Sequence, residues 1–345
     1  MTDFSALIRG WYRLSKRDLP WRSSKDAYKI WLSEIMLQQT RVDQGRSYFE
    51  KFVHQYPTVF ELAEAPQDEV LNLWQGLGYY SRARNLHTAA QAIVEKYDGV
   101  FPSNFKDIIG LKGVGDYTAS AIASIAFGLP HAVVDGNVYR VLSRYFADAT
   151  PIDSTQGKKK FKQIAQDLLD ETHPGDHNQA LMELGALVCL PRNPACENCP
   201  LNGSCMAFET GNPHEYPVKE KKTKVRERPI QYLVLTDGEQ VLIKKRKKRD
   251  IWQGLYDFPS MEQKQTGLLK AKDLNRGEIE WIREDGQFKH VLSHQRIYAT
   301  FWLVHCRNLK PVGDEEMILK NEIEDFPLPQ LLIRYIRATP FFNAE

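Results

Sequence analysis

Four of the five cysteines in this chain lie between residues 189 and 205. Their spacing is C-x6-C-x2-C-x5-C, and no histidine lies between them. Zinc sites usually show two short-spaced pairs of ligands, whereas four thiolates on one compact loop suit a [4Fe–4S] cube. The pattern therefore predicts an iron–sulfur cluster, with zinc as the alternative, held by Cys189, Cys196, Cys199 and Cys205. Such ligands fit a reducing cytoplasm better than a secreted disulfide framework does.

Two carboxyl groups stand in settings that can give them different roles. Glu34 lies beside the apolar stripe of a predicted helix, DAYKIWLSEIMLQQTRV, which Asp26 is placed to cap. Partial desolvation raises the pKa of such a carboxyl, so Glu34 could hold a proton and deliver it as a general acid. Asp135 follows two β-branched residues, Val133 and Val134. The plainer alternatives are a salt-bridged glutamate and a turn aspartate.

A glycine pair lies at the start of a second predicted helix, in LKGVGDYTASAIASIAFGLP. Gly113, Val114 and Gly115 precede the helix, and Gly128 and Pro130 are expected to end it. Bare N–H groups at a helix start form an anion site, and phosphate is the expected anion. A tight turn is the alternative for an isolated G-x-G. With an acid just beyond the helix, the stretch suits an enzyme that holds a nucleic-acid backbone while acting on one nucleotide.

Three further segments carry side chains suited to contact with bases. Near the N-terminus, aromatic and basic residues are interleaved, including Trp21 and Arg22. They could be core anchors and surface charges, and they also resemble a surface on which a base could stack. Gln39 and Thr40, at a helix end, offer donors and acceptors for base edges. The glycine-rich turn in GLGYYSRARNL presents Leu77 and Tyr79, which could wedge between base steps or pack as core residues between two helices.

The secondary structure predicted from the sequence changes near residue 211. The preceding segments read as helices, and GNPHEYPVKEKKTKVRERP is proline-flanked and charged, as linkers are. Strand patterns follow: residues 230–235 and 241–243 flank an Asp-Gly turn, which predicts a hairpin, and residues 297–305 form another strand. Cys306, on an apparent strand, is expected to be buried. The predicted fold class is multidomain, α plus α/β, with an all-helical domain at 1–210, a linker at 211–229 and an α/β domain at 230–345.

Composition narrows the function less than the motifs do. The net charge of +2 does not by itself imply nucleic acid, and the grouped lysines and arginines add weak support. The chain lacks an apolar run of about 18 residues, so no membrane span is expected. The N-terminal segment does not read as a signal peptide. These features predict a cytoplasmic protein.

The motifs together resemble a known family. Helix–GVG–helix, VVDGNV and the four-cysteine pattern, in that order, resemble the helix-hairpin-helix DNA glycosylases of the endonuclease III superfamily. That resemblance covers residues 1 to about 215, and the whole chain resembles the adenine glycosylases of the superfamily. It implies base excision repair on double-stranded DNA containing A:8-oxoguanine or A:G mispairs, by a monomer that would be nucleoid-associated in a bacterium.

The resemblance implies roles for the matching positions. Glu34 would protonate a flipped-out adenine, and Asp135 would stabilise the cationic sugar, with Tyr117 and Asn137 beside it, before water replaces the base. Asp135 could do so covalently or electrostatically. The hairpin residues Gly113, Val114 and Gly115 would bind the DNA backbone. The other positions assigned to the pocket or to the lesion pair are Trp21, Arg22, Gln39, Thr40, Leu77, Tyr79 and Gln179.

Position 117 separates two kinds of enzyme within this superfamily. Members that cleave the strand carry a lysine directly after the hairpin, and this lysine attacks the sugar to form a Schiff base. Tyr117 stands there in this chain. Since a phenol cannot form an imine, the resemblance implies a monofunctional glycosylase.

The second domain resembles the Nudix-like domain that reads the oxidised guanine. A hydrolytic Nudix site needs GX5E followed by REUXEE, and the sequence contains no such run, so binding without hydrolysis is expected. HVLSHQRI matches the lesion-reading loop, with Ser293 and His294 as its polar members. The family often has phenylalanine where this chain has Leu292.

Two other functions stay open. A thymine or oxidised-pyrimidine glycosylase of the same fold would keep the cluster and the hairpin, but the second domain favours adenine. A non-catalytic protein that binds damaged DNA would keep the fold without needing both acids, Glu34 and Asp135, so their presence disfavours it.

Overall fold

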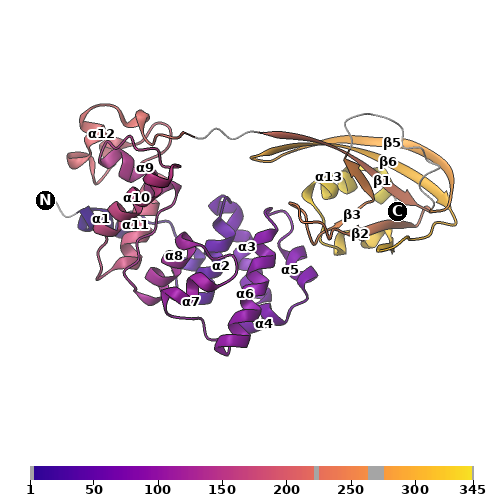
Figure 1. Cartoon of the computed structure of the whole chain (residues 1–345), viewed down its shortest axis with the longest axis horizontal. Helices are drawn as coiled ribbons and strands as arrows, with labels where there is room; N and C mark the ends of the chain where they lie inside the picture. Colours follow the sequence, from indigo (N-terminus) through magenta and orange to yellow (C-terminus); the bar gives the residue numbers. More distant parts are fainter. Residues whose placement is uncertain (1–3, 221–224, 263–275, 344–345) are drawn as a thin grey trace. The chain divides into compact units, whose positions relative to one another are not determined.

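The computed structural model describes residues 4–220, 225–262 and 276–343 (Figure 1). It divides into two compact units. One is helical and the other is built around a sheet, in line with the expected α and α/β parts. The helical unit comprises Met1–Glu64 and Thr88–Lys222, and the sheet unit comprises Ala65–His87 and Thr223–Glu345. None of the helices in the described part of the chain has the length and apolar character that a bilayer crossing requires.

The helical unit has two groups of helices, which can be followed in Figure 1. One group contains α1 (Phe4–Ser15), α9 (Gly136–Tyr145), α10 (Thr155–Asp167), α11 (Pro174–Leu187) and α12 (Met206–Glu209). The other contains α2 (Ala27–Leu37), α3 (Val42–Gln55), α4 (Val59–Glu64), α7 (Phe105–Gly110), α8 (Asp116–Phe127) and the later turns of α6 (Ser81–Tyr97). Because α11 packs on both α9 and α8, it joins the two groups.

The first group is held by an apolar core that fixes α9 in place. Val138 and Leu142 of α9 pack with Phe161 of α10 and Leu184 of α11, and all four are fully buried. Burial of each such side chain is worth about 1.5–3 kcal/mol. These apolar contacts therefore fix the position of α9, and with it the position of Asp135 at the start of the helix.

The glycine stretch forms the predicted hairpin between α7 and α8. Gly113 has φ +80°, a left-handed conformation that glycine adopts without strain. Gly115 caps α8 without a side-chain hydrogen bond, which leaves backbone donors at the helix start free of a side-chain cap. Gly128 ends α8 with φ +67°, as the sequence predicted.

Among the described residues of the sheet unit, seven strands form one sheet with the path β3-β2-β1-β6-β5, while β4 pairs with β1 and β7 with β2. Its strands are β1 (Arg226–Thr236), β2 (Gln240–Lys245), β3 (Tyr256–Asp257), β4 (Ser260–Glu262), β5 (Glu278–Val291), β6 (Gln295–Arg307) and β7 (Glu315–Leu319). β1 and β2 form the predicted antiparallel hairpin, whereas β1 and β6 are parallel. Cys306 on β6 is 1% exposed, as expected.

Helix α13 (Gln330–Ala338), followed by α14 (Pro340–Asn343), packs against this sheet. Tyr335 of α13 stacks on Phe301 of β6 with ring centroids 3.8 Å apart. Tyr335 also donates a hydrogen bond of 2.8 Å to Asp285 on β5. The helix therefore covers one face of the central strands.

Residues 65–87 pack with the sheet unit although they lie between helices in sequence. They contain α5 (Gln67–Leu73) and the start of α6. Asn72 donates to the carbonyl of Asp325 at 2.8 Å, and the backbone N–H of Leu328 donates to Gln75 at 2.8 Å. Lys245 pairs with Asp68. No sequence pattern indicated this association.

Candidate active site

A cavity of about 230 Å³ lies in the helical unit where η1 (Pro20–Arg22), α2, α8, α11 and the start of α9 meet. Eight of the residues proposed from sequence line it, namely Trp21, Arg22, Glu34, Thr40, Tyr117, Asp135, Asn137 and Gln179. These positions span more than 150 residues of chain, so only the tertiary fold brings them together. The cavity combines apolar walls with convergent polar groups, as ligand sites do.

Glu34 presents a buried carboxyl to this cavity from the middle of α2. Asp26 caps α2 as predicted, accepting a hydrogen bond from the backbone N–H of Tyr28 at 2.9 Å. Glu34 is only 8% exposed. Burial raises its pKa to about 7, and the nearby charge of Asp135 adds to the rise, while a hydrogen bond with Tyr117 opposes it. The carboxyl can therefore carry a proton near neutral pH.

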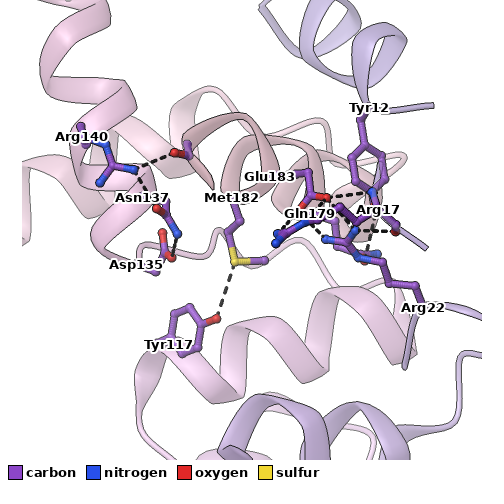
Figure 2. Close-up of polar contacts among 11 residues, drawn as sticks. Tyr12, Arg17, Arg22, Tyr117, Asp135, Asn137, Arg140, Gln179, Met182 and Glu183 are labelled. Atoms are coloured by element: carbon purple, nitrogen blue, oxygen red, sulfur yellow. Dashed lines mark hydrogen bonds and ion pairs between the residues drawn. The ribbon is translucent and has the colours of Figure 1, made fainter. Parts of the chain in front are cut away.

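Asp135 faces the same cavity as the N-cap of α9. Its carboxylate accepts hydrogen bonds from the backbone N–H of Val138 at 2.7 Å and from Asn137 Nδ2 at 2.8 Å. Burial raises the pKa of Asp135, and these donors counteract the rise by favouring the ionised form. As an N-cap it also receives the positive end of the helix dipole. The hydrogen bond from Asn137 to Asp135 is drawn in Figure 2.

Tyr117, in the first turn of α8, lies near both acids. Its hydroxyl donates to Met182 Sδ of α11 at 3.6 Å (Figure 2) and is also hydrogen-bonded with Glu34. Burial raises the pKa of Tyr117 well above its usual value, so the phenol stays protonated. It can donate a hydrogen bond but cannot act as an amine nucleophile.

Glu183 of α11 is a cavity residue that the sequence reasoning missed. It binds Arg22 at 2.8 Å and Arg17 at 2.6 Å (Figure 2), and its side chain is 1% exposed. The two guanidinium groups hold the pKa of Glu183 down to about 2 despite its burial. The signal was available, because Glu183 follows Gln179 by four residues and so shares its helix face. Gln179 itself accepts a hydrogen bond from Tyr12 at 3.1 Å.

Arg140 is a second missed residue, and it connects the acid to the cysteine loop. Its Nη2 donates to Asn137 Oδ1 at 2.8 Å, and its Nε donates to the carbonyl of Cys189 at 2.7 Å. Since Asn137 in turn donates to Asp135, a continuous hydrogen-bond chain runs from the first cysteine to the catalytic candidate. Figure 2 shows the Arg140–Asn137–Asp135 part of this chain.

The cysteine loop forms a compact pocket next to α9. Cys189, Cys196, Cys199 and Cys205 line one cavity of about 30 Å³ whose other walls are largely apolar. None of the four takes part in a disulfide, and Arg144 donates to Cys189 Sγ at 3.3 Å. Burial raises the pKa of Cys199 to about 11, a cost that iron would offset by binding the thiolate. Four converging thiols with a cationic donor fit a thiolate-bound cluster.

The remaining predicted residues lie elsewhere. Gln39 is exposed at the end of α2 with φ +57°, a conformation that costs a non-glycine residue about 1–3 kcal/mol. In the sheet unit, Tyr79 is 37% exposed with φ +49°, and its hydroxyl lies 3.1 Å from Ser293 Oγ. Leu77, two residues before Tyr79 in the glycine-rich turn, is buried with 6% of its surface exposed. His294 Nδ1 is 3.3 Å from Ser293 Oγ.

Three segments of the chain match known protein families. Residues 32–171 match the HhH-GPD superfamily of base excision DNA repair proteins. Residues 189–205 match the iron–sulfur binding domain of endonuclease III, and residues 231–338 match the NUDIX domain. The four-cysteine pocket is therefore a [4Fe–4S] site, as the spacing predicted.

Individual proteins are similar over most of the chain. Adenine DNA glycosylase of Buchnera aphidicola subsp. Baizongia pistaciae is 36% identical over 304 residues, covering 87% of this chain and 86% of that protein. Adenine DNA glycosylase of Homo sapiens is 35% identical over 359 residues, covering 86% of this chain and 66% of that protein. Among solved structures, a thermostable thymine-DNA glycosylase aligns with a TM-score of 0.56 and 32% identity, covering 60% of this chain and 95% of its own.

Proposed function

Because this chain belongs to the adenine DNA glycosylase (MutY) family, whose members hydrolyse N-glycosyl bonds in DNA, we propose that it removes adenine mispaired with 8-oxoguanine or guanine by an acid-assisted, monofunctional mechanism. The observation that carries the mechanism is a single cavity with a buried, proton-holding Glu34 and a hydrogen-bonded Asp135. The adenine must leave the duplex to enter this cavity.

Glu34 supplies the proton for the leaving group. As the bond between the sugar C1′ and the adenine nitrogen breaks, its electron pair moves onto the base, and the proton from Glu34 neutralises the charge. General acid assistance of this kind is worth about 10²–10⁴-fold in rate. Its raised pKa keeps the proton available near neutral pH.

Asp135 opposes the positive charge that remains on the sugar. Two donors and the start of α9 hold its carboxylate in place and favour its ionised form beside the cation. Water then adds to C1′ and gives up a proton, for which the ionised Glu34 is an acceptor in the same cavity. The products are free adenine and an abasic sugar.

The strand stays intact because no amine is available to attack the sugar. Tyr117 takes the place of the lysine used by strand-cleaving members, and none of the described residues lining the cavity is a lysine. A Schiff base at this site is therefore not expected.

In the sheet unit, we assign recognition of the oxidised guanine to Ser293 and His294. Their polar side chains lie together at the β5–β6 turn, with Tyr79 hydrogen-bonded to Ser293. Tyr79 is exposed for contact with the duplex, and Leu77 supports the turn from below. Gln39 and Thr40, at the end of α2, would contact the lesion pair from the helical unit.

The DNA backbone has two candidate contacts in the helical unit. The hairpin residues Gly113, Val114 and Gly115 lie at the start of α8, where the glycines can offer backbone donors. The N–H of Val114 already donates to the carbonyl of Leu111 at 3.1 Å. Arg192 is exposed on the cysteine loop. Cys189, Cys196, Cys199 and Cys205 would hold the cluster, whose iron–thiolate bonds would stabilise the fold of the loop and so position Arg192 to contact a phosphate.

Single-turnover base release tests the function directly. Duplexes with A opposite 8-oxoguanine, A opposite G and T opposite G are incubated with excess enzyme, with and without alkali. We expect adenine release, fastest opposite 8-oxoguanine, and strand breaks after alkali alone. Thymine release, or breaks without alkali, would assign the fold to another substrate or mechanism. Tight binding without any release would favour a damage-binding protein.

A further inference from the structure

The sheet unit contains a large basic cavity, of about 590 Å³, that the proposed function does not use. It lies between the start of β1, the β2–β3 connection and β4. Eight cationic side chains line it, namely Arg226, Arg228, Lys244, Lys245, Arg246, Lys247, Lys248 and Arg249. We propose that this basic cavity binds backbone phosphates of the DNA next to the oxidised guanine. The proposal rests on the lesion-reading role assigned above to Ser293 and His294.

The charges around the cavity do not cancel. Glu262 accepts from both Arg226 and Arg228, and Asp314 pairs with Lys247 at 3.2 Å. The remaining pairs join Lys245 to Asp68, and Arg246 to Asp250 and Asp257. Eight cations therefore face five carboxylates, which leaves an excess of positive charge for an anionic ligand.

Three of the eight cations, Lys244, Lys248 and Arg249, form no salt bridge within the described residues, and the last two are the most open to a ligand. Lys248 and Arg249 are exposed, and neither pairs with an acid anywhere in the described part of the chain. The loop that carries them is ordered by backbone hydrogen bonds from Gly254 to Arg246 and from Arg246 to Leu255, both 2.8 Å. Because these hydrogen bonds already order the loop, its backbone loses less conformational freedom when a ligand binds.

The cavity is continuous with the lesion-reading turn. Gln295, one of its lining residues, accepts from Arg228 Nη1 at 3.0 Å, and its Nε2 lies 2.8 Å from His294 Nε2. The backbone N–H of Arg226 donates to the carbonyl of His294 at 3.0 Å. Residues that would contact the oxidised base and residues that would contact phosphate thus share one hydrogen-bonded wall.

The geometry of a duplex explains why phosphodiesters suit this wall. Phosphates follow one another about every 3.4 Å of helix axis on each strand. A strand whose oxidised guanine lies at Ser293 therefore carries several phosphates within a few nucleotides. Contacts of this kind set the register of a protein on DNA without reading sequence. In this cavity they would place Ser293 and His294 at the lesion.

The test compares salt dependence of binding. A Lys248→Ala, Arg249→Ala double variant is measured against a matched control, Lys310→Ala with Lys320→Ala, whose lysines lie outside the cavity. The duplex carries 8-oxoguanine opposite a non-hydrolysable adenosine analogue, and Kd is determined over a range of salt concentrations. We expect the slope of log Kd against log salt to fall by about one per lost phosphate contact in the first variant. The control should keep the wild-type slope.

A charge-preserving variant guards against misfolding. Lys248→Arg with Arg249→Lys retains both charges and should keep the wild-type slope. Preference for the 8-oxoguanine duplex over the guanine duplex should persist in the alanine variant, because phosphate contacts weaken all sequences alike. An unchanged slope in the alanine variant would overturn the proposal.

A free polyphosphate is the rival ligand. If the alanine variant loses binding of inorganic tripolyphosphate in calorimetry but keeps the wild-type DNA slope, the cavity serves a free nucleotide and the DNA assignment is wrong. Base release by the wild-type enzyme is scored separately. A wild-type protein that releases no adenine refutes the proposed function, whereas the salt slope concerns this cavity alone.

Discussion

At the scale of single residues, one cavity holds two acids, Glu34 and Asp135. Burial shifts their pKa values in the same direction, whereas their hydrogen bonds differ. Burial raises the pKa of both Glu34 and Asp135. Asp135 receives two close donors that favour its charge, whereas the charge of Asp135 raises the pKa of Glu34 further. The pair is therefore polarised into a proton donor and a carboxylate, the arrangement that acid-assisted glycosidic cleavage requires.

This polarisation predicts a pH profile. Below about pH 7, Glu34 holds its proton and the single-turnover rate of adenine release should be at its plateau. Above that pH the acid is lost and the rate should fall about tenfold per pH unit. At low pH the rate should fall again as Asp135 takes up a proton, since its pKa is raised. A rate that stays flat across the alkaline side would contradict the role of Glu34.

Replacing Glu34 separates catalysis from folding. Glu34→Gln should lower excision by about 10²–10⁴-fold and leave binding of the lesion duplex intact. A buried carboxyl with a raised pKa contributes stability that is present below its unfolded pKa and lost as pH rises through about 7. The melting temperature of the wild type should therefore drop between pH 6 and pH 8 more than that of the variant. Glu95→Gln, on the exposed side of α6, is the control.

At the scale of elements, the cavity is built from helices that are distant in sequence and joined by charge pairs. Glu183 of α11 holds Arg22 of η1 and Arg17 just before it, so the N-terminal segment is tied to α11. These pairs keep Trp21 and Arg22 at the cavity wall. Arg140 does the same between α9 and the cysteine loop.

Removing Glu183 should loosen this wall. Glu183→Ala leaves Arg22, 14% exposed, without its acid, and we expect a loss of roughly 2–3 kcal/mol in unfolding free energy. The loss stays below that of a fully buried pair because Arg17 is 34% exposed. Denaturant unfolding measures the change, with Glu95→Ala for comparison. A variant as stable as this control would show that the pairs contribute nothing to holding the wall.

Helix α5 gives a second prediction at this scale. Asn72, Gln75 and Asp68 bond to residues of the sheet unit, so α5 should open together with the sheet. In native-state hydrogen exchange, amides of α5 should show the same denaturant dependence as those of β1 and β6. Exchange that follows α2 and α8 instead would show that α5 belongs energetically to the helical unit.

At the scale of the whole molecule, the two units divide the proposed labour. The helical unit contains the acids and the cluster loop, and the sheet unit contains Ser293, His294 and the exposed Tyr79. Substrate preference should therefore respond to changes that leave the chemistry untouched. The sequence boundaries 1–210, 211–229 and 230–345 remain our proposal for the domain organisation.

Ser293→Ala tests this division. One hydrogen bond is worth about 0.5–1.5 kcal/mol, so preference for A:8-oxoguanine over A:G should fall by about twofold to tenfold. The single-turnover rate on A:G should be unchanged, because the proposed catalytic cavity lies in the helical unit. Equal losses on both substrates would contradict a recognition role for Ser293.

The sequence alone determined those features that depend on neighbours along the chain. Cysteine spacing predicted the cluster loop, Asp26 predicted the start of α2, and the Asp-Gly turn predicted the β1–β2 hairpin. Glu34 was predicted to be desolvated because the apolar residues around it are its own helix neighbours. Local patterns of this kind carry their own physical cause.

Only the tertiary structure decided which side chains meet across long stretches of chain. It brought Glu34 and Asp135 to one cavity, paired Glu183 with Arg17 and Arg22, and packed α5 with the sheet. The parallel pairing of β1 with β6 was equally invisible in the sequence. Such contacts depend on how whole faces pack, and a single sequence specifies each face without specifying its partner.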